Sequence, residues 1–326
     1  MRPHRKVQNE STKNDPVIES LPLACANEEA AVEFMEKQRW GDHPACPFCG
    51  SLAVYKMMDS KEPSKRQANF RWRCKEKECH AQFTVRVGTV FEESRIPLKH
   101  WAFAFWRAAT SKKGISALEI HRQTGVSYKS ALFMLHRIRH AMDETDIEPL
   151  NGIVEVDEVY IGGKPRRIHG TRFTDAKTKD RKTPVIGMIE RGGRVRPKVL
   201  ADVNAENLKA AINANIARGS RIMTDDLPSY RGLKRDGWQH EFVKHSMYEF
   251  VRGDVTTNAI EGFFGLMKRG INGIYHSVSK KHLHRYLSEY QFRFNNRDLT
   301  DGERAVAAIK AAQGKRLTYA QQVGND

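Results

Sequence analysis

The run IVEVDEVYI, residues 153–161, has the composition of a β-strand, yet it carries acidic side chains among its apolar ones. β-Branched residues favour strands, whereas carboxylates are depleted from strands and are costly to bury without a partner or a metal ion. Asp157 lies at the centre of the run, between Glu155 and Glu158. The run therefore predicts a strand of a sheet, and its carboxylates are either charges of an edge strand or part of a site.

Two further carboxylates lie in similar surroundings. Asp225 ends the strand-like run IMTD, residues 222–225, and Glu261 lies in the first turns of the helix-like segment NAIEGFF, residues 258–264. Two-metal phosphoryl transfer needs carboxylates on rigid elements that converge on two ions about 3.5–4 Å apart. Mg²⁺ combines a few carboxylates with water and substrate phosphate. Together with Asp157, these residues predict a site for two Mg²⁺ or Mn²⁺ ions, although Asp225 could instead begin a turn.

The segment that begins at Asn258 carries a second set of signals. Glu261 could complete a helix capping box with Asn258, a role that does not exclude metal binding. Glu261, Gly265 and Lys268 are spaced i, i+4 and i+7, so they share one helix face. A nucleic-acid backbone could approach at Gly265, and Lys268 and Arg269 would then contact phosphate. The alternative for Lys268 is a solvated lysine.

The charge balance favours a polyanionic partner. Among 326 residues, 55 Lys and Arg face 39 Asp and Glu, which gives a net charge of +16. Solubility alone suggests a net charge of only about 2–8. Nucleic acid, bound through phosphate contacts and counterion release, explains the excess. No run approaches the ~20 apolar residues of a membrane helix, and the N-terminus lacks an apolar signal segment. We expect a soluble cytoplasmic protein associated with the nucleoid and not with a membrane.

All five cysteines precede residue 80, and four of them form two pairs: Cys46, Cys49, Cys74 and Cys79. The knuckle CPFCG, residues 46–50, directs two thiolates at one ion, and the second pair would complete a tetrahedral zinc site. Zinc would supply much of the folding free energy of this small region. The second spacing, C-x4-C, is wider than usual, so His43 and His80 are possible substitute ligands. Cys25 has no partner in this scheme and is read as structural.

Between the cysteines and the acidic strand, the apolar residues recur with the spacing of a helix. Ser116, followed by Glu119 in a capping-box pattern, and Ser127 would cap two helices joined by a turn at Gly125. This pattern matches a helix-turn-helix, although a plain helical bundle is equally consistent. The first turn of the second helix would present three residues to DNA: Tyr128, Lys129 and Ser130. Further along this helix, charge would be added by Arg137 and Arg139.

The largest region alternates between strand-like and helix-like runs. Strands are expected at 153–161, 184–190, 195–203 and 221–225, and helices at 205–217, 258–269 and 280–296. This β-β-β-α-β-α order predicts an α/β fold with a mixed sheet flanked by helices. The loop-like stretch 163–183 carries eight Lys and Arg, so it is read as a phosphate-binding arm or as an ordinary solvated loop.

Several motifs together resemble bacterial insertion-sequence transposases of the D-D-E type, in the branch with an N-terminal zinc ribbon and an integrase-like catalytic domain. The resemblance covers about residues 25–297. Its motifs are CPFCG at 46–50, VEVDEVYIGGK at 154–164, TD at 224–225, TNAIEGFFGLMKRG at 257–270, and KHLHRYL at 281–287 followed by FRFN at 292–295.

The resemblance implies an RNase H-like fold and two Mg²⁺ ions held by Asp157, Asp225 and Glu261, with Lys268 as a DNA contact. Asn258 stays a possible alternative ligand, because some relatives use Asn as the third residue. The implied partner is double-stranded DNA, cut at terminal inverted repeats and joined to a target by a homodimer or larger assembly. The alternatives are a non-catalytic DNA-binding regulator and a metal-dependent nuclease.

The expected domains follow from these assignments. They are a disordered tail at 1–24, a zinc ribbon with a leading helix at 25–92, a helix-turn-helix region at 93–148, an RNase H-like catalytic domain at 149–300 and a peripheral tail at 301–326.

Overall fold

The computed structural model of the chain describes residues 15–144, 148–163 and 182–323. The chain forms two compact units. The first runs up to residue 111 and also includes 115–142 and the segment from 297 onward. The second, called the sheet unit below, comprises 112–114 and 143–296. The predicted ribbon and helix-turn-helix regions therefore lie together in the first unit.

The sheet unit is built on a five-stranded mixed sheet, in the order β6-β5-β4-β7-β8. The central strand β4 pairs antiparallel with β5 and parallel with β7. β6 pairs antiparallel with β5, and β8 pairs parallel with β7. The strands are β4 (Ile153–Ile161), β5 (Thr183–Glu190), β6 (Val195–Val199), β7 (Arg221–Thr224) and β8 (Gln239–Phe242). This arrangement confirms the predicted α/β fold with an RNase H-like mixed sheet.

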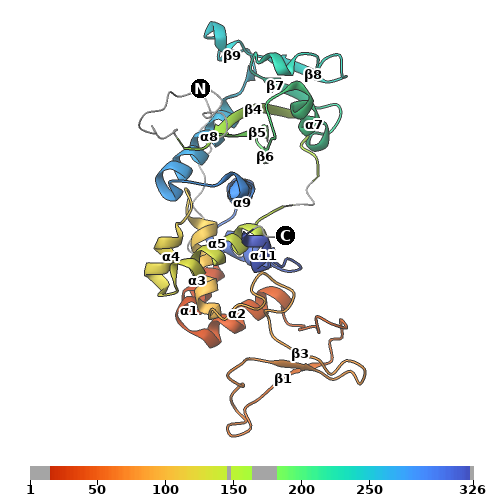
Figure 1. Ribbon diagram of the computed structural model, residues 1–326. Helices are drawn as coiled ribbons and strands as arrows, with labels where there is room; N and C mark the ends of the chain where they lie inside the picture. Colours follow the sequence, from red (N-terminus) through yellow and green to blue (C-terminus); the bar gives the residue numbers. More distant parts are fainter. Residues whose placement is uncertain (1–14, 145–147, 164–181, 324–326) are drawn as a thin grey trace. The chain divides into compact units, whose positions relative to one another are not determined.

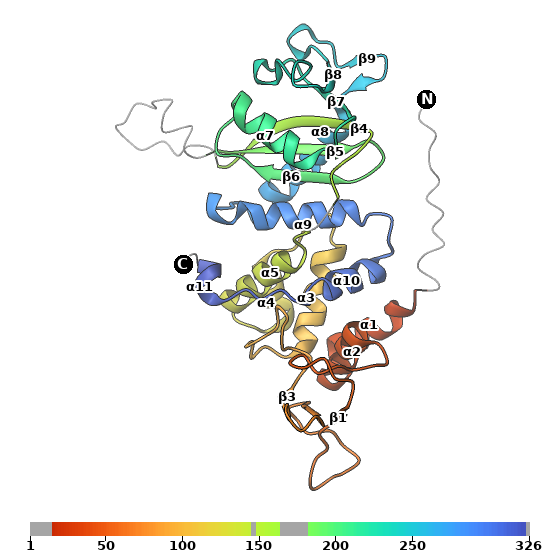
Figure 2. The same ribbon diagram turned by 90° about the vertical axis from the view of Figure 1, so that its right-hand side faces the viewer.

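Helices cover both faces of this sheet because β4 and β5 bury apolar side chains on both sides. Helix α7 (Ala205–Asn215) packs on one face with Val154, Val156 and Ile186 (Figure 2). Helices α8 (Asn258–Gly270) and α9 (Leu283–Asn295) pack on the other face. Alternate residues of a strand face opposite sides, so Asp157 faces α8 whereas Glu158 faces α7.

A glycine sets how closely α8 approaches the sheet. Gly187 of β5 lies directly opposite Asp157 in the ladder. A Cβ atom at Gly187 would lie 2.5 Å from Cζ of Phe264 and 2.6 Å from Cδ1 of Ile260, both on α8. Any side chain at this position would therefore push the helix away from the strand that carries Asp157.

Several short elements have no counterpart in the sequence prediction. Strand β8 has the sequence QHEF, which lacks the apolar alternation that marks a strand. A small hairpin follows, formed by β9 (Val251–Arg252) and β10 (Val255–Thr256). Short helical turns occur at Pro228–Tyr230, His245–Met247 and Ile271–Tyr275. The expected helix at 280–296 also begins with such a turn, at Lys280–His282. Most of these additions lie between Asp225 and Glu261.

The first unit combines a helical bundle with a small sheet (Figure 1). Helix α3 packs against α1, α2, α5 and α10. The helices are α1 (Pro16–Ala26), α2 (Glu28–Trp40), α3 (Leu98–Thr110), α4 (Ala117–Thr124), α5 (Tyr128–Ala141), α10 (Asp301–Lys310) and α11 (Tyr319–Val323). The sheet has the order β1 (Val54–Lys56), β2 (Trp72–Cys74), β3 (Gln82–Phe83). The predicted caps Ser116 and Ser127 are confirmed at α4 and α5.

The prediction was wrong for the described part of both terminal segments. Residues 16–24 belong to helix α1, although Pro22 lies inside it and obscures its pattern. Asp15 caps this helix and accepts hydrogen bonds from Thr300 and Gly302, next to α10. Helix α10 is not peripheral, because Ala305, Ala308 and Ile309 are buried. Both terminal segments thus complete the helical bundle.

Candidate functional site

Strands β4 and β7 bring the first two predicted carboxylates together. The strands run parallel, and the last pair of their ladder is Glu155 with Met223. Asp157 and Asp225 follow this pair by two residues each, on the same side of their strands. Asp157, Glu158 and Asp225 each place a carboxylate oxygen within 4.8 Å of the others. We call these three residues the acidic group.

Glu158 also belongs to the acidic group, although the sequence suggests only a possible edge-strand charge at this position. Its Oε2 accepts a hydrogen bond of 2.6 Å from the hydroxyl of Tyr230, which is buried beneath the sheet face that α7 covers. Strand alternation argues against two adjacent ligands, so the sequence gives no reason to select Glu158 beside Asp157. Tyr230 fixes this carboxylate in place.

The electrostatics of the acidic group favour a bound cation. Burial, and secondly the charge of Glu158, raise the pKa of Asp157 to about 7. Burial also raises the pKa values of Glu158 and Asp225. Buried carboxylates that repel one another in this way are stabilised by a divalent ion, and oxygen ligands are those that Mg²⁺ prefers. The residues present therefore fit a magnesium site.

Glu261 lies outside the acidic group. Its side chain is 44% exposed, and its Oε1 accepts a hydrogen bond of 2.9 Å from the hydroxyl of Thr257. Nε2 of His245 lies 3.7 Å from the same oxygen. The carboxylate is still near enough to contribute to the raised pKa of Asp157. Its role as third ligand stays a prediction.

The structure rules out the alternative in which Glu261 completes a capping box with Asn258. The N-cap is Thr257, so Asn258 is the first residue of the helix and Glu261 is one position too late for the box. Asn258 is exposed, and its backbone N–H donates to the hydroxyl of Thr256. The side chain of Thr257 caps no backbone N–H group.

Glu155 supplies the missing cap from the neighbouring strand. Its carboxylate is buried and accepts hydrogen bonds from the backbone N–H groups of Ala259, at 2.7 Å, and Ile260, at 3.3 Å. Arg191 donates to its other oxygen at 2.9 Å. A carboxylate is favourable at a helix N-terminus because it accepts unpaired N–H groups and complements the helix dipole. Glu155 is therefore no edge charge. It ties the helix that carries Glu261 to the strand that carries Asp157.

The predicted DNA contacts on α8 lie on its surface. Lys268 and Arg269 are exposed in the last turn of the helix. Around Gly265 the backbone is open: the nearest atom to an added Cβ would be a guanidinium nitrogen of Arg269, at 3.5 Å. Their contact with DNA stays a prediction. The basic stretch 163–183 falls almost entirely at 164–181, outside the described residues.

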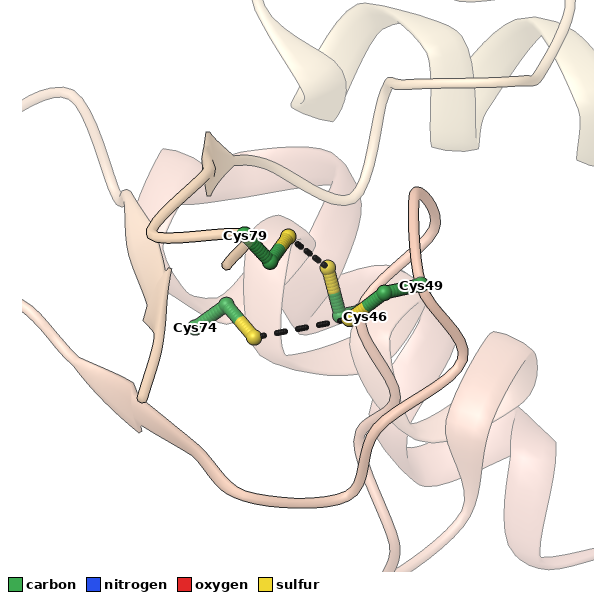
Figure 3. Close-up of side chains that lie close together, drawn as sticks. All are labelled: Cys46, Cys49, Cys74 and Cys79. Carbon is green, nitrogen blue, oxygen red and sulfur yellow. Dashed lines mark hydrogen bonds between the residues drawn. The ribbon is translucent and has the colours of Figure 1, made fainter. Parts of the chain in front are cut away.

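The four paired cysteines converge as predicted (Figure 3). Sγ of Cys46 lies 3.7 Å from Sγ of Cys79, and Sγ of Cys49 lies 3.6 Å from Sγ of Cys74. Both separations are longer than the S–S bond of a disulfide. They match the ~3.8 Å between two sulfur atoms of a tetrahedral zinc site with Zn–S bonds of about 2.3 Å. Neither predicted substitute, His43 nor His80, belongs to the group.

The surroundings of the cysteines agree with a structural site. Glu36 of the leading helix α2 accepts hydrogen bonds from Trp72, at 2.7 Å, and from Arg66, at 2.9 and 3.1 Å. The ribbon is thus fastened to its helix by a buried carboxylate. Burial raises the pKa of the remaining thiol, Cys25, to about 11, so Cys25 stays protonated.

The two helices of the helix-turn-helix candidate are present, but some of the residues expected to contact DNA make hydrogen bonds within the protein or are buried. Tyr128 and Lys129 are exposed at the start of α5, whereas Ser130 is hydrogen-bonded to the capping Ser127. The prediction of surface charge from Arg137 and Arg139 is wrong. Arg137 donates to the carbonyls of residues 90 and 92, and Arg139 is buried. Contact of Tyr128, Lys129 and Ser130 with DNA stays a prediction.

No helix among the described residues combines the length and the apolar character needed to cross a membrane.

Comparison with known proteins identifies the family. Residues 149–295 match the ISXO2-like transposase domain, and residues 26–82 match the transposase zinc-ribbon domain. An uncharacterized protein in transposable element ISH50 of Halobacterium salinarum is 28% identical over 279 residues, covering 82% of this chain and 90% of that protein. An uncharacterized transposase-like protein of Haemophilus influenzae is 27% identical over 106 residues, covering 32% of this chain and 85% of that protein.

A solved structure, a pre-cleavage Mos1 transpososome, shares 16% identity at a TM-score of 0.26, covering 62% of this chain and 75% of that chain. At that TM-score it adds nothing to the fold assignment, which rests on the strand order. Both matched domains are transposase domains, and the chain belongs to the insertion-sequence transposases.

Proposed function

We propose that this transposase binds the terminal inverted repeats of a mobile element, cuts a phosphodiester at each end and joins the freed 3′-hydroxyls to target DNA. The observation that carries the proposal is the acidic group, in which Asp157, Glu158 and Asp225 converge within 4.8 Å inside a chain of net charge +16. Carboxylates gathered within a basic protein suit a metal site that acts on a polyanion.

Asp157 and Asp225 would hold the cations, with Glu158 beside them. Two Mg²⁺ or Mn²⁺ ions there would activate the attacking oxygen and stabilise the leaving oxygen. Glu261 would complete the ligand set when DNA is bound, with the exposed Asn258 as a minor alternative. The buried Glu155 would keep α8 in place during this step.

The reaction needs no covalent bond between protein and DNA. Water attacks the scissile phosphodiester and releases a 3′-hydroxyl. That hydroxyl then attacks a phosphodiester of the target in the same site, so one bond forms as another breaks. Lys268 and Arg269 would hold backbone phosphates on the open face of α8, where Gly265 leaves room.

The first unit would select the element ends. The zinc ribbon and the start of α5 would bind double-stranded DNA, with Tyr128, Lys129 and Ser130 in the position of base-reading residues. The basic stretch 163–183 would act as a phosphate-binding arm. Because two ends must be joined together, we propose a homodimer or a larger assembly on DNA, which would form at the nucleoid.

Joining of a pre-cut element end to a plasmid, with magnesium present, tests this proposal. The transposase gives joined product. A nuclease would give nicked plasmid without joined product, and a non-catalytic regulator would give no DNA chemistry at all. If both Asp157→Asn and Asp225→Asn kept full joining activity, the assignment of the acidic group would be wrong.

A further inference from the structure

A cavity of about 550 Å³ opens beside the acidic group. Asp225 forms part of its wall, and the rest comes from the segment after β7, from β8 and from the turn that follows β8. Its size falls in the range of small-ligand sites. Any phosphate held at Asp225 therefore has this cavity as its immediate neighbour.

The cavity lining combines apolar and cationic side chains. Its apolar wall includes Leu227, the ring of Tyr230, Phe242 and Met247. Basic side chains also line it: Arg231, Lys234, Arg235 and Lys244. Apolar contact together with positive charge fits a ligand with a flat apolar part and a phosphate part. A nucleotide has this chemistry.

One wall of the cavity offers rings for stacking. The rings of His240 and Phe242 lie 6.0 Å apart and 31° from parallel, and the guanidinium of Arg252 lies 6.0 Å from the Phe242 ring centre. Burial lowers the pKa of His240 to about 4, so its ring is neutral near pH 7. Nε2 of His240 lies 3.0 Å from Oγ1 of Thr224, which holds the ring at the end of β7.

The turn at the cavity mouth is apolar and exposed. Met247 is 70% exposed and Tyr248 is 85% exposed, with Phe250 and Val251 exposed beside them. The turn is anchored beside Asp225 and next to α8, because Ser246 donates a hydrogen bond to Asp226 and Nε2 of His245 lies 3.7 Å from Oε1 of Glu261. Apolar side chains exposed at this place are suited to contact with bases.

We propose that this cavity binds the base of an unpaired nucleotide next to the phosphate held at the acidic group. The proposal rests on the proposed function and extends it to a second subsite. A paired base is stacked inside the duplex and cannot enter, so the strand must be opened at this nucleotide. Phe242 and His240 contact the base, and the basic side chains of the lining hold the adjoining phosphates.

A pair of DNA probes with equal charge tests the subsite. Both are the same short duplex with a single-stranded 3′ extension, made of thymidine in one probe and of abasic nucleotides in the other. Binding to the zinc-loaded full chain is measured by anisotropy with calcium in place of magnesium. Because a base that stacks on an aromatic ring adds to affinity, we expect the thymidine probe to bind about tenfold more tightly.

Variants locate the preference within the molecule. Ser246→Leu narrows the cavity mouth from an exposed position without adding a ring on which a base can stack, and it should bring the affinity ratio of the two probes closer to one. Phe242→Leu, which removes the stacking ring but keeps an apolar side chain, should reduce the ratio as well. Tyr160→Ala is the control, because Tyr160 is an exposed aromatic residue of the same unit that does not line the cavity, and it should leave the ratio unchanged.

Equal affinity of the wild-type chain for both probes would overturn the subsite, as would a ratio that both cavity variants leave intact. The joining assay separates this outcome from failure of the proposed function. Joining without a base preference removes the subsite alone. A base preference without magnesium-dependent chemistry keeps the subsite and removes the proposed function.

Discussion

The cysteine group and the acidic group are both sets of converging ligand atoms, but they are built differently. The four sulfurs come from the turn that holds Cys46 and Cys49, from Cys74 at the end of β2 and from Cys79 in the turn that follows β2. Their spacing already matches a tetrahedral zinc site. The acidic group joins strands β4 and β7, and the predicted third ligand, Glu261, lies outside it on α8. A structural site is complete within the protein, whereas a catalytic site keeps positions open for substrate.

The largest effect is expected on zinc binding by the cysteine group, whose ligand set is complete within the protein. Cys74→Ser removes one of four ligands that share roughly 10–16 kcal/mol of zinc binding, so zinc affinity should fall about a hundredfold or more. Residues 46–83 should then lose protection from hydrogen exchange. Metal analysis should find one zinc per wild-type chain. Cys25→Ser is the matched control and should retain the zinc. Equal zinc content in both variants would contradict the tetrahedral assignment.

The next effect concerns catalysis at the open site. Asp157→Asn keeps the shape of the side chain but removes the charge that holds a cation. Because metal stabilisation of the transition state is worth several kcal/mol, we expect joining to slow about a thousandfold. Asp236→Asn, a change of the same type at an exposed position, should join at the wild-type rate. A similar loss in both variants would point to a general effect of charge.

Asp157→Asn should also stabilise the folded protein when magnesium is absent. The pKa of Asp157 is about 7 in the folded state and 3.8 in the reference state, so the folded state binds this proton more tightly. Stability should therefore fall as pH rises from about 4 to about 7, by roughly 4 kcal/mol at most. The amide that Asp157→Asn introduces cannot ionise, so the variant should be the more stable protein at pH 8 and equal to wild type at pH 4. Hydrogen exchange of β4 and β5 in zinc-loaded, magnesium-free protein measures this difference.

A smaller effect should follow from loosening α8. Glu155→Gln weakens the bonds to Arg191 and to the N-terminus of α8, each made by a charged acceptor. We expect a loss of roughly 2 kcal/mol in the local stability of α8, measured by hydrogen exchange. Joining should slow as well, because Glu261 lies on this helix. Glu190→Gln, the same change at the end of β5, is the control and should leave α8 as protected as in wild type.

The smallest effect concerns one phosphate contact. Lys268→Ala should weaken DNA binding and reduce the salt dependence of the binding constant by about one phosphate's worth. Lys198→Ala, an exposed lysine on β6, provides the comparison. A salt slope that Lys268→Ala leaves unchanged would make Lys268 an ordinary solvated lysine.

The sequence was most informative where local rules decide the structure. The knuckle spacing identified the cysteine group, and Ser116 and Ser127 identified helix starts. Asp157 and Asp225 could be paired because each marks its own strand, and β4 and β7 do lie side by side. Such features depend on residues close together in the chain.

The sequence does not predict roles that depend on tertiary contacts between distant residues. Glu158 joins the acidic group because Tyr230, distant in sequence, holds its carboxylate. Glu155 caps a helix about a hundred residues away, so no local pattern marks it. Strand β8 is recognisable only beside β7, which supplies its hydrogen bonds. Each of these residues has an ordinary local context and gains its role from a partner elsewhere.

Manganese binding to the DNA-free protein, followed by electron paramagnetic resonance with the zinc site filled, reports whether the acidic group holds a cation. If Asp157, Glu158 and Asp225 form the cation site, Asp157→Asn and Asp225→Asn should each weaken Mn²⁺ binding about tenfold or more, since one carboxylate ligand is worth at least about 1.4 kcal/mol. Glu261→Gln should have a smaller effect until DNA is added. Unchanged Mn²⁺ affinity in both aspartate variants would show that the acidic group is not the cation site.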